Sequence, residues 1–416
     1  MHQMVFPLRI NMDAYYLQMC LACGSGHLDT VLNLRDQPLA NNFLSSPTDE
    51  EPKYPLAVNL CKNCCHLQLT YAVDPAVIYR HYLYVSGTSQ TQRVYMQWFA
   101  KFACEFFHEK PKTVLDIGCN DGTQLDYFGE LGIKTFGIDP AENLYADSSK
   151  KHTIMCDFFN LDTARKFRSQ HGTVDCVVAQ NSFAHVPDPV GYLEALREVI
   201  NPDGLFLIQT SQADMVLNNE FDTIYHEHVN FYNINSMREL CRRTGFNLVD
   251  VQKTPIHGTS YVFVLSVNKQ APERVNNLIE FERQKGLLDT NTYHNWAETV
   301  RKNVATVDSY GFLFRNKGFK MIGYGAAAKG NTLLNFSHLP LDMIIDDNPL
   351  KQGTYSPGRH IPVVGIDILD RIPSTQPILF VPLAWNFYRE IRNRILAKRQ
   401  QEHDRFMRYF PEVTIE

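Results

Sequence analysis

Two pairs of cysteines have the spacing of a metal site. Cys20 and Cys23 form one C-x-x-C pair, and after 37 intervening residues Cys61 and Cys64 form another. Each pair can present two thiolates to one tetrahedral ion, so the two pairs together would close a four-sulfur shell. Because a closed shell has no position for water, the spacing predicts a structural Zn²⁺, with the adjacent Cys65 outside it. Coincidental pairs, or one redox-active pair, would show the same spacing.

A glycine turn is the second chemical signal. Residues 114–123 read VLDIGCNDGT, which is typical of a strand, a turn and a helix start. The G-x-G-x-x-G spacing of a dinucleotide site is missing. Gly118 and Gly122 would let the backbone approach a ligand, and Asp116 would suit a cationic one. Asp139 follows Asp116 by 23 residues, at the end of the next apolar segment, where a carboxylate can accept both ribose hydroxyls. Taken alone, Asp116 is equally typical of a turn.

This motif resembles the first motif of the class I S-adenosylmethionine-dependent methyltransferases. Those enzymes carry acidic-h-G-x-G-x-G, and Asn120 stands here in place of the middle glycine. The resemblance implies S-adenosylmethionine as cofactor, with adenine contacts at 157–158 and a further residue near the cofactor at 181, after the strand that ends at 180. The expected cofactor-binding residues are Asp116, Gly118, Asn120, Asp121, Gly122, Asp139, Asp157, Phe158 and Asn181.

A run of ionisable side chains is the third signal. Tyr225, His226, Glu227 and His228 are consecutive, in a chain with only 15 histidines. The run is not H-E-x-x-H, and adjacent residues do not share one helix face, so a metal site is not expected there. A solvated loop is one interpretation. The other follows from the strand expected at 205–209, whose carboxyl end should border a cleft, where a histidine could accept a proton at neutral pH.

These residues need elements that bring them together. Apolar segments that alternate with helical ones predict a mainly parallel, doubly wound α/β sheet. The expected strands lie at 113–117, 135–139, 175–179, 205–209 and 260–265, and a second set lies at 320–325, 343–347 and 378–381. A helical stretch at 270–316 separates the two sets. We therefore expect three domains: 1–90 for zinc, 91–268 for the cofactor and 269–416 as a Rossmann-like α/β domain.

The composition restricts the class of protein. The chain has 416 residues, with 40 Lys and Arg against 45 Asp and Glu, and a net charge of −5. This balance disfavours nucleic-acid binding by bulk electrostatics. No apolar segment approaches the roughly 20 residues of a membrane helix, and the N-terminus lacks a signal peptide's pattern. Ten cysteines fit a reducing compartment. We expect a cytoplasmic monomer that binds neither nucleic acid nor membrane.

Taken together, the motifs resemble the nucleotide-sugar C-methyltransferases, three-part enzymes that methylate C3 of 4-keto-deoxysugars. The resemblance covers nearly the whole chain. It comprises both cysteine pairs, 39–41, 54–56, Tyr82, Tyr84, Ser86, 120–123, Asn181, His185, Asp188, 222–228, 323–331, 346–353 and 357–362.

The resemblance implies a reaction and roles. The substrate would be a nucleoside-diphosphate 4-keto-deoxysugar of dTDP or GDP type, in branched-deoxysugar biosynthesis for a polysaccharide or a secondary metabolite. His228 would be the general base that forms an enolate. Tyr225, Glu227, Tyr82 and Tyr84 would surround the ketosugar, where a phenol could stabilise the developing negative charge.

The C-terminal block would hold the substrate. Its small residues at 323–331 would let the backbone approach a diphosphate at a helix start. The expected substrate-binding residues are Lys329, Asn331, Asp347, Lys351, His360 and His185. A second Rossmann-like fold with an empty crevice would show the same pattern.

One segment departs from the family's pattern. Around His257 these enzymes tend to carry a second glycine and an arginine, where this chain has Thr259 and Val262. The exact sugar and nucleotide therefore stay open. An O- or N-methyltransferase acting on a nucleotide sugar, a zinc-ribbon RNA methyltransferase and a non-catalytic sugar-nucleotide binding protein are the alternatives.

Overall fold

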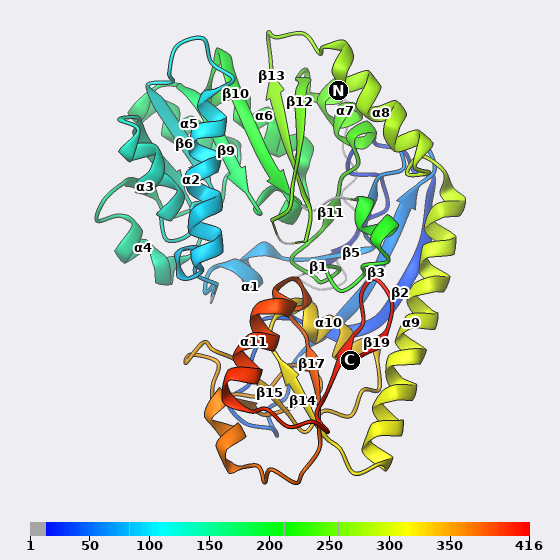
Figure 1. Cartoon of the computed structure of the whole chain (residues 1–416). Coiled ribbons are helices and arrows are strands. Elements are labelled where there is room, and N and C mark those ends of the chain that lie inside the picture. Colours follow the sequence, from blue (N-terminus) through cyan, green and yellow to red (C-terminus); the bar gives the residue numbers. More distant parts are fainter. Residues whose placement is uncertain (1–13, 83, 211–212, 257) are drawn as a thin grey trace. The chain divides into compact units, whose positions relative to one another are not determined.

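The computed structural model describes residues 14–82, 84–210, 213–256 and 258–416, so His257 lies outside the described residues (Figure 1). The chain forms two compact units. Unit 1 comprises 1–29, 59–213 and 227–290, and unit 2 comprises 30–58, 214–226 and 291–416. These units group residues by contact, whereas the division into 1–90, 91–268 and 269–416 groups them by task and stays a prediction.

A seven-stranded sheet forms the centre of unit 1, in the order β12-β13-β10-β9-β6-β7-β8. All neighbours are parallel except β13, which runs antiparallel to both β10 and β12. The strands are β6 (Thr113–Ile117), β7 (Lys134–Ile138), β8 (Thr153–Met155), β9 (Val174–Gln180), β10 (Ile200–Thr210), β12 (Asn247–Thr254) and β13 (Ser260–Ser266). The five strands expected in this region are confirmed.

Helices cover both faces of this sheet, because the strands are apolar on both sides. One face packs against α2 (Gln90–Cys104) and α3 (Thr123–Glu130). The other face is covered by α5 (Leu161–His171), α6 (Pro189–Val199), α7 (Ile234–Thr244) and α8 (Glu273–Gln284). The chain runs outward from β6 through β7 to β8, by way of α4 (Glu142–Ser148), and then returns to β9 on the other side of β6. Such a reversal opens a crevice at the carboxyl ends of β6 and β9.

Smaller elements of unit 1 carry the cysteines and the aromatic residues. β1 (Ala14–Tyr16) pairs with β5 (Tyr71–Val73), and β4 (Leu67–Leu69) pairs with β11 (Asn230–Phe231), both antiparallel. The short helices are α1 (Pro75–Tyr79), η1 (Ser86–Thr88) and η2 (Phe183–His185). The long strands β2 (Leu28–Pro38) and β3 (Lys53–Cys61) carry the chain from one unit to the other.

A six-stranded sheet forms the centre of unit 2, in the order β16-β15-β14-β17-β18-β19. Its strands are β14 (Lys320–Tyr324), β15 (Met343–Ile345), β16 (Val363–Val364), β17 (Ile378–Pro382), β18 (Arg405–Arg408) and β19 (Thr414–Ile415). All pairs are parallel except β18 with β19. The order again reverses beside the first strand of the set, here between β14 and β17. Unit 2 thus repeats the doubly wound plan, as expected.

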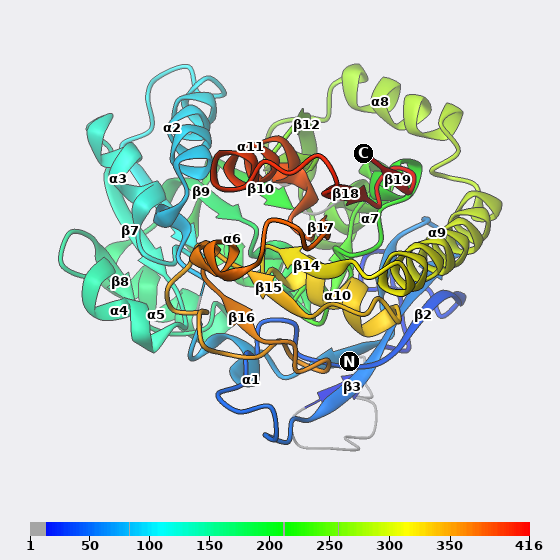
Figure 2. The ribbon, with the colours of Figure 1, turned by 60° about the horizontal axis from the view of Figure 1, so that its bottom comes forward.

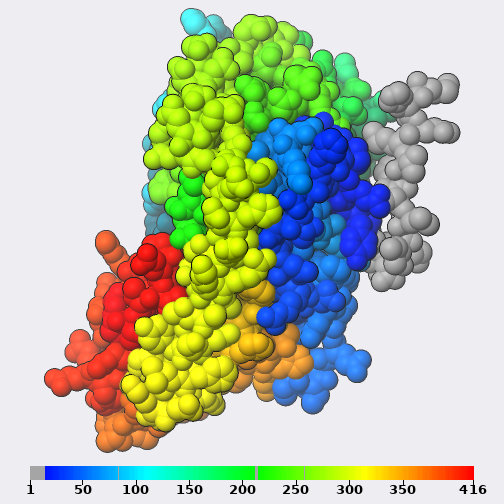
Figure 3. Space-filling model, turned by 90° about the vertical axis from the view of Figure 1, so that its right-hand side faces the viewer, coloured from blue at the N-terminus to red at the C-terminus, as the bar shows by residue number. Residues whose placement is uncertain are grey.

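Helices flank this second sheet as well. α11 (Tyr388–Lys398) packs on one face, and α10 (Ala328–Phe336) lies on the other (Figure 2). The long α9 (Thr290–Asn316) forms a continuous band at the surface beside β2, where Arg301 donates to the carbonyl of Val31 (Figure 3). The turns η3 (Ala213–Asn218), η4 (Ile366–Arg371) and η5 (Trp385–Phe387) complete the elements. Throughout the described ranges, none of the helices has both the length and the apolar character that spanning a bilayer requires.

Candidate active site

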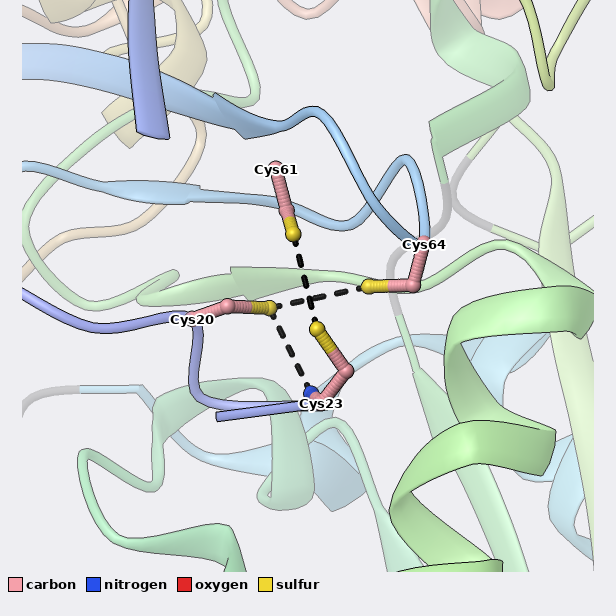
Figure 4. Close-up of side chains that lie close together, drawn as sticks. All are labelled: Cys20, Cys23, Cys61 and Cys64. Carbon is pink, nitrogen blue, oxygen red and sulfur yellow. Dashed lines mark hydrogen bonds between the residues drawn. The ribbon is translucent and has the colours of Figure 1, made fainter. Parts of the chain in front are cut away.

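The four predicted zinc ligands converge on one point (Figure 4). Their sulfur atoms all lie within 4.8 Å of one another, with Cys20 and Cys64 3.6 Å apart and Cys23 and Cys61 3.5 Å apart. A zinc–sulfur bond of about 2.3 Å and tetrahedral angles would place the sulfurs about 3.8 Å apart. The geometry and the donor set fit a closed structural site.

Cys65 stands apart from this cluster, as expected. Its φ of 56° reverses the chain directly after Cys64, and its side chain is 5% exposed. Burial raises the pKa of the Cys65 thiol to about 11, so this sulfur stays protonated at neutral pH. It is therefore a matched control for the four ligands.

The glycine turn lies at the crevice between β6 and β9. Gly118 has a φ of 83°, and a Cβ there would lie 2.6 Å from the Cβ of Ser182, the second residue after β9. The two loops that leave the carboxyl ends of β6 and β9 therefore touch. Only glycine permits both the dihedral angle and the close approach. The predicted cofactor loop and Asn181, whose φ is 54°, thus border the same crevice.

Asp139 is tied to the turn from the end of β7. Its Oδ2 accepts from the backbone amide of Asn120 at 2.8 Å, and its Oδ1 accepts from that of Ala141 at 2.8 Å. Asn120 has a φ of 51°, a left-handed conformation that asparagine tolerates better than most residues. This explains how it occupies a position where the family carries glycine. Burial raises the pKa of Asp139, and the two amide donors oppose that rise.

The segment that contains Tyr84 is bound to the same turn. Asn120 accepts from the amide of Ser86 at 2.9 Å and donates to the carbonyl of Tyr84 at 3.0 Å. The Oδ2 of Asp121 accepts from the amide of Gly87 at 2.9 Å. The side chains that sequence reasoning assigned to the cofactor thus also hold the chain around Tyr84 against the crevice.

Asp157 and Phe158 follow β8 at the next carboxyl end. Asp157 is exposed, and its Oδ1 accepts from the amide of Phe158 at 2.8 Å. The guanidinium of Arg80 lies 5.7 Å from the centroid of the Phe158 ring. Both residues are placed where an adenine contact is predicted, beside Asp139 in the sheet order.

Asp116 is the deepest carboxyl group of the crevice. It is 3% exposed, and its Oδ1 is buried without a hydrogen-bond partner among the described residues. Burial, then the charges of Asp139 and Asp121, raise its pKa to about 8. In the folded protein this carboxyl therefore keeps its proton across a pH range in which the unfolded chain, with a pKa of about 4, has lost it.

Asp116→Asn is expected to remove a pH dependence of stability. Between about pH 4 and pH 8 the folded state binds the extra proton, so the free energy of unfolding falls as pH rises, by about 1.4 kcal/mol per unit. Urea unfolding of the ligand-free protein at pH 5, 6, 7 and 8 measures this slope. The exposed Asp157→Asn serves as control and should keep it. An unchanged slope in Asp116→Asn would show that this carboxyl does not titrate in that range.

A column of stacked rings forms beside the crevice. The ring of Tyr79 stacks on that of His185, with centroids 5.2 Å apart and an interplanar angle of 7°. His185 in turn stacks on His228 at 5.3 Å and 27°. Burial lowers the pKa of His185 to about 3, so the middle ring is neutral. The column fixes the plane of the His228 ring. A general base needs such a fixed orientation before the substrate arrives.

Glu227 joins the tyrosines to this column. The hydroxyl of Tyr82 donates to Oε2 of Glu227 at 2.7 Å, and the hydroxyl of Tyr79 donates to the Glu227 carbonyl at 3.2 Å. The Tyr82 and Tyr84 rings lie 6.4 Å apart. Unit 1 therefore brings together five of the predicted residues, namely Tyr82, Tyr84, His185, Glu227 and His228. Tyr225 belongs to unit 2, two residues before the chain returns to unit 1 at Glu227.

Tyr79 was not predicted from the sequence as a residue of the site. It is one of several aromatic residues between 79 and 84, and nothing in their spacing separates a ring of the column from a core tyrosine. Its role is evident from the fold, through its contacts with His185 and with Glu227.

Unit 2 repeats the crevice of unit 1 at the carboxyl ends of β14 and β17. Gly325 has a φ of 92°, and a Cβ there would lie 2.8 Å from the Cβ of Ala384. Asp346 follows β15 as Asp139 follows β7. Its Oδ2 accepts from the amide of Ala326 at 2.7 Å, and its Oδ1 from that of Asn348 at 2.8 Å. The second sheet thus has its own acidic group at the glycine turn.

Asp347, the neighbouring acid that sequence reasoning selected, has other partners. Its Oδ1 accepts from the hydroxyl of Tyr324 at 2.9 Å, and Arg394 pairs with its Oδ2. Asp346, which accepts from the glycine turn as Asp139 does in unit 1, was not selected from the sequence. The signal was present, because a ribose-binding acid is expected directly after the strand that follows the glycine turn.

Lys329 lies among aromatic and acidic side chains of unit 2. Its Nζ is 4.8 Å from the centroid of the Trp385 ring. Trp385 donates from its indole to Asp222 Oδ2 at 2.8 Å, and Asp222 is completely buried. Burial raises the pKa of Asp222, and the positive charge of Lys329 opposes that rise. Burial also raises the pKa of Glu220, to about 7.

The remaining predicted substrate residues have partners within unit 2. Lys351 donates to the carbonyl of Ala326 at 2.7 Å, which places its charge at the glycine turn. Asn331 is 1% exposed and donates to the carbonyl of Ala40 at 2.7 Å. His360 Nδ1 lies 2.7 Å from the carbonyl of Pro47. Of these three residues, Lys351 is the one held at the repeated crevice.

Comparisons with known proteins match all three parts of the chain. Residues 20–79 match the family described as "Putative zinc binding domain", residues 88–251 match "Methyltransferase domain", and residues 255–411 match "C-methyltransferase C-terminal domain". These matches confirm the expected resemblance and the methyltransferase fold, and together with the four-cysteine cluster they support the zinc site.

Among curated proteins, the chain is similar to the C-methyltransferase NovU of Streptomyces niveus. The two are 28% identical over 384 residues, which cover 89% of this chain and 90% of NovU. A ubiquinone biosynthesis O-methyltransferase of Paraburkholderia xenovorans (strain LB400) is 24% identical over 39% of this chain and 75% of its own. Among solved structures, magnesium protoporphyrin IX methyltransferase from Synechocystis PCC 6803 matches 42% of this chain and 78% of its own, with 13% identity and a TM-score of 0.32.

Proposed function

We propose that this S-adenosylmethionine-dependent C-methyltransferase, a homologue of NovU, adds a methyl group to C3 of a nucleoside-diphosphate 4-keto-deoxysugar. The observation that supports this most is the joining of His228, Glu227 and Tyr82 at the cofactor crevice, on the unit that holds the cofactor loop. A base, a carboxylate and a phenol are the groups that forming an enolate requires.

The reaction begins with loss of a proton. A hydrogen on C3 is weakly acidic because the neighbouring C4 is a ketone. His228 takes that proton, and the electron pair of the C–H bond moves into an enolate. The phenol of Tyr84, or that of Tyr82 once its proton turns from Glu227 to the substrate, stabilises the charge on the enolate oxygen, a contribution often worth about 3 kcal/mol. Tyr225 is assigned to the same ketosugar, on the segment that leads into Glu227 and His228.

The carbon then attacks a methyl group. S-adenosylmethionine, when bound, would supply that methyl group as an electrophile, so that the C3 electron pair forms the new C–C bond and the electron pair of the former S–C bond stays on sulfur. Asp139 would accept the ribose hydroxyls, Asp116 and Asp121 would face the positive charges, and Gly118 and Gly122 would allow close approach.

Further cofactor contacts come from the neighbouring loops. Asp157 and Phe158 would border the adenine, and Asn120 and Asn181 would line the turn. The zinc site takes no part in bond making, because four cysteines leave no open position for a substrate.

Unit 2 is proposed to hold the nucleotide. The glycine turn at Gly325, the start of α10 and the charges of Lys329 and Lys351 suit a diphosphate. Asp346, which repeats the geometry of Asp139, is proposed for the ribose. Asn331, Asp347 and His360 keep their assignment to the substrate side as proposals. The nucleotide is proposed to be of dTDP or GDP type, so its base would be thymine or guanine.

Methyl transfer with hydrogen exchange tests the reaction. Purified protein, S-adenosylmethionine and dTDP-4-keto-2,6-dideoxyhexose are incubated in heavy water and followed by mass spectrometry. A product heavier by one methyl group, together with deuterium at C3 of unreacted substrate, is expected. A C3 hydrogen that does not exchange when S-adenosylmethionine is withheld, together with a product methylated on oxygen or nitrogen when it is supplied, would contradict an enolate. A GDP-4-keto-deoxysugar serves as the second substrate.

The same experiment decides against an O-methyltransferase. That alternative has one specific support, the similarity of 39% of the chain to the ubiquinone biosynthesis O-methyltransferase. Oxygen methylation leaves the C3 hydrogen in place and gives a product whose new methyl group is released by ether cleavage. Carbon methylation gives a product that resists it. We further propose that the protein is a monomer and that it is cytoplasmic, where its ten cysteines, which form no disulfide in the structure, would stay reduced.

A further inference from the structure

The chain segment that carries His228 is held on both sides. Val229, the next residue, donates its amide to the carbonyl of Ala184 at 2.9 Å. Its own carbonyl accepts from the amide of Leu69 at 2.9 Å. Ala184 lies in η2, next to His185 of the ring column, and Leu69 is the last residue of β4. The backbone after His228 is thus clamped between the loop of its stacking partner and the strand that follows the second cysteine pair.

The side chain of Asn230 repeats this clamp. It is completely buried, and its Nδ2 donates to the carbonyl of Val186 at 2.7 Å, directly after His185. Its Oδ1 lies 3.0 Å from Nε2 of His66. Since the amide nitrogen is used on Val186, the amide oxygen faces His66, and the proton of this bond must come from His66 Nε2. One side chain therefore bridges the loop of His185 and the ring of His66.

His66 belongs to the fold of the sulfur cluster. It comes two residues after Cys64, its carbonyl accepts from the amide of Cys61 at 2.9 Å, and its ring is completely buried. The ring lies 4.7 Å from that of Tyr232, on the same segment as Asn230. The path from the four sulfurs to His228 thus runs through the Cys61–His66 turn, the His66–Asn230 bond and two residues of chain.

We infer that Asn230 is a positioning residue for the base. Through Asn230 and His66, the cysteine cluster fixes where the ring of His228 stands, so the zinc-binding part contributes to catalysis without touching the substrate. The inference rests on the proposed function, because it takes His228 as the base. A catalytic group displaced by about 1 Å can lower the reaction rate by up to about 10²-fold. A displaced His228 ring would therefore lower the rate even where the fold is kept.

A second asparagine offers a matched comparison. The side chain of Asn235 is bonded to the cysteine turn as well, but as a donor, with its amide on the carbonyl of Cys64 at 3.1 Å. It lies on α7, beyond the segment that carries His228, and joins the turn to the outer helix layer instead. Asn230→Ala and Asn235→Ala therefore each remove one side-chain hydrogen bond to the cysteine turn, but only Asn230→Ala also removes a bond next to the base, the one to the carbonyl of Val186.

The test combines kinetics with a readout that needs no substrate. Asn230→Ala should keep its zinc content and its affinity for S-adenosylmethionine, leave KM little changed, and lower kcat by about 10-fold to 10²-fold. In protein labelled with ¹³C at Cε1 of its histidines, the His228 signal, identified by its loss in His228→Ala, should shift as the ring column changes. Asn235→Ala should alter neither kcat nor that signal.

The possible results separate the two proposals. A normal kcat per folded molecule and an unshifted His228 signal in Asn230→Ala would overturn the positioning role. If Asn230→Ala does not fold, His66→Phe, which removes the donor to Asn230 and keeps a ring beside Tyr232, takes its place with the same expectations. A wild-type protein that neither exchanges nor methylates any ketosugar would remove the proposed reaction, whereas the His228 signal would still test the placement.

Discussion

His228→Ala is expected to lower kcat of methyl transfer by about 10²-fold or more, the usual loss when a general base is removed. The affinity for S-adenosylmethionine should stay as in the wild type, because the predicted cofactor residues lie on other loops. C3 hydrogen exchange should fall in parallel with methyl transfer, since both need the same proton to leave. Stopped assays give kcat, calorimetry gives the cofactor affinity, and mass spectrometry gives the exchange.

A neighbouring histidine controls for disturbance of the segment. His226 is two residues earlier and buried, and its Nε2 lies 3.3 Å from the carbonyl of Tyr54, within unit 2. His226→Gln keeps a nitrogen donor for that carbonyl and should cost stability rather than kcat. Full activity of His228→Ala, or equal loss in the two variants, would remove His228 from the role of base.

Much of the fold could be predicted, because apolar segments flanked by turns specify buried parallel strands. Residues 113–117 match β6 at both ends, and 320–325 and 378–381 match β14 and β17 to within a residue. Two strands of the first sheet were not predicted. β8 has only three residues and is partly exposed, and β12 alternates too weakly to stand out from a loop. They are edge strands, where burial imposes the least pattern.

The site was predictable where one residue type does one task. Four cysteines at fixed spacing and Asp139 after a strand needed no knowledge of the packing. The choice between Asp346 and Asp347 required knowledge of the packing, because adjacent residues at a strand end point in different directions. Only the fold shows which of the two contacts the glycine turn. The same holds for Asn230 and His66, which are 164 positions apart in sequence.

Cys61→Ser is the second replacement with a large expected effect. It leaves three sulfurs around the ion, and the hydroxyl of serine is a far weaker zinc ligand than a thiolate. Because zinc binding and folding are coupled in such sites, loss of the ion also costs stability. Zinc measured by mass spectrometry should fall from one ion per chain toward none, and the melting temperature should fall with it. Cys20→Ser should behave alike.

Cys65→Ser provides the comparison that separates a lost ligand from a lost thiol. Cys65 is as buried as its neighbours and lies on the same turn, yet its sulfur is outside the cluster. Its replacement should leave the zinc content unchanged. If Cys61→Ser also kept its zinc, the four-cysteine assignment would be wrong. Cys61→Ser could also lose its zinc while the His228 signal and kcat stay normal. In that case the ion would stabilise only the cysteine turn, and the contacts through His66 and Asn230 would not affect the position of the base.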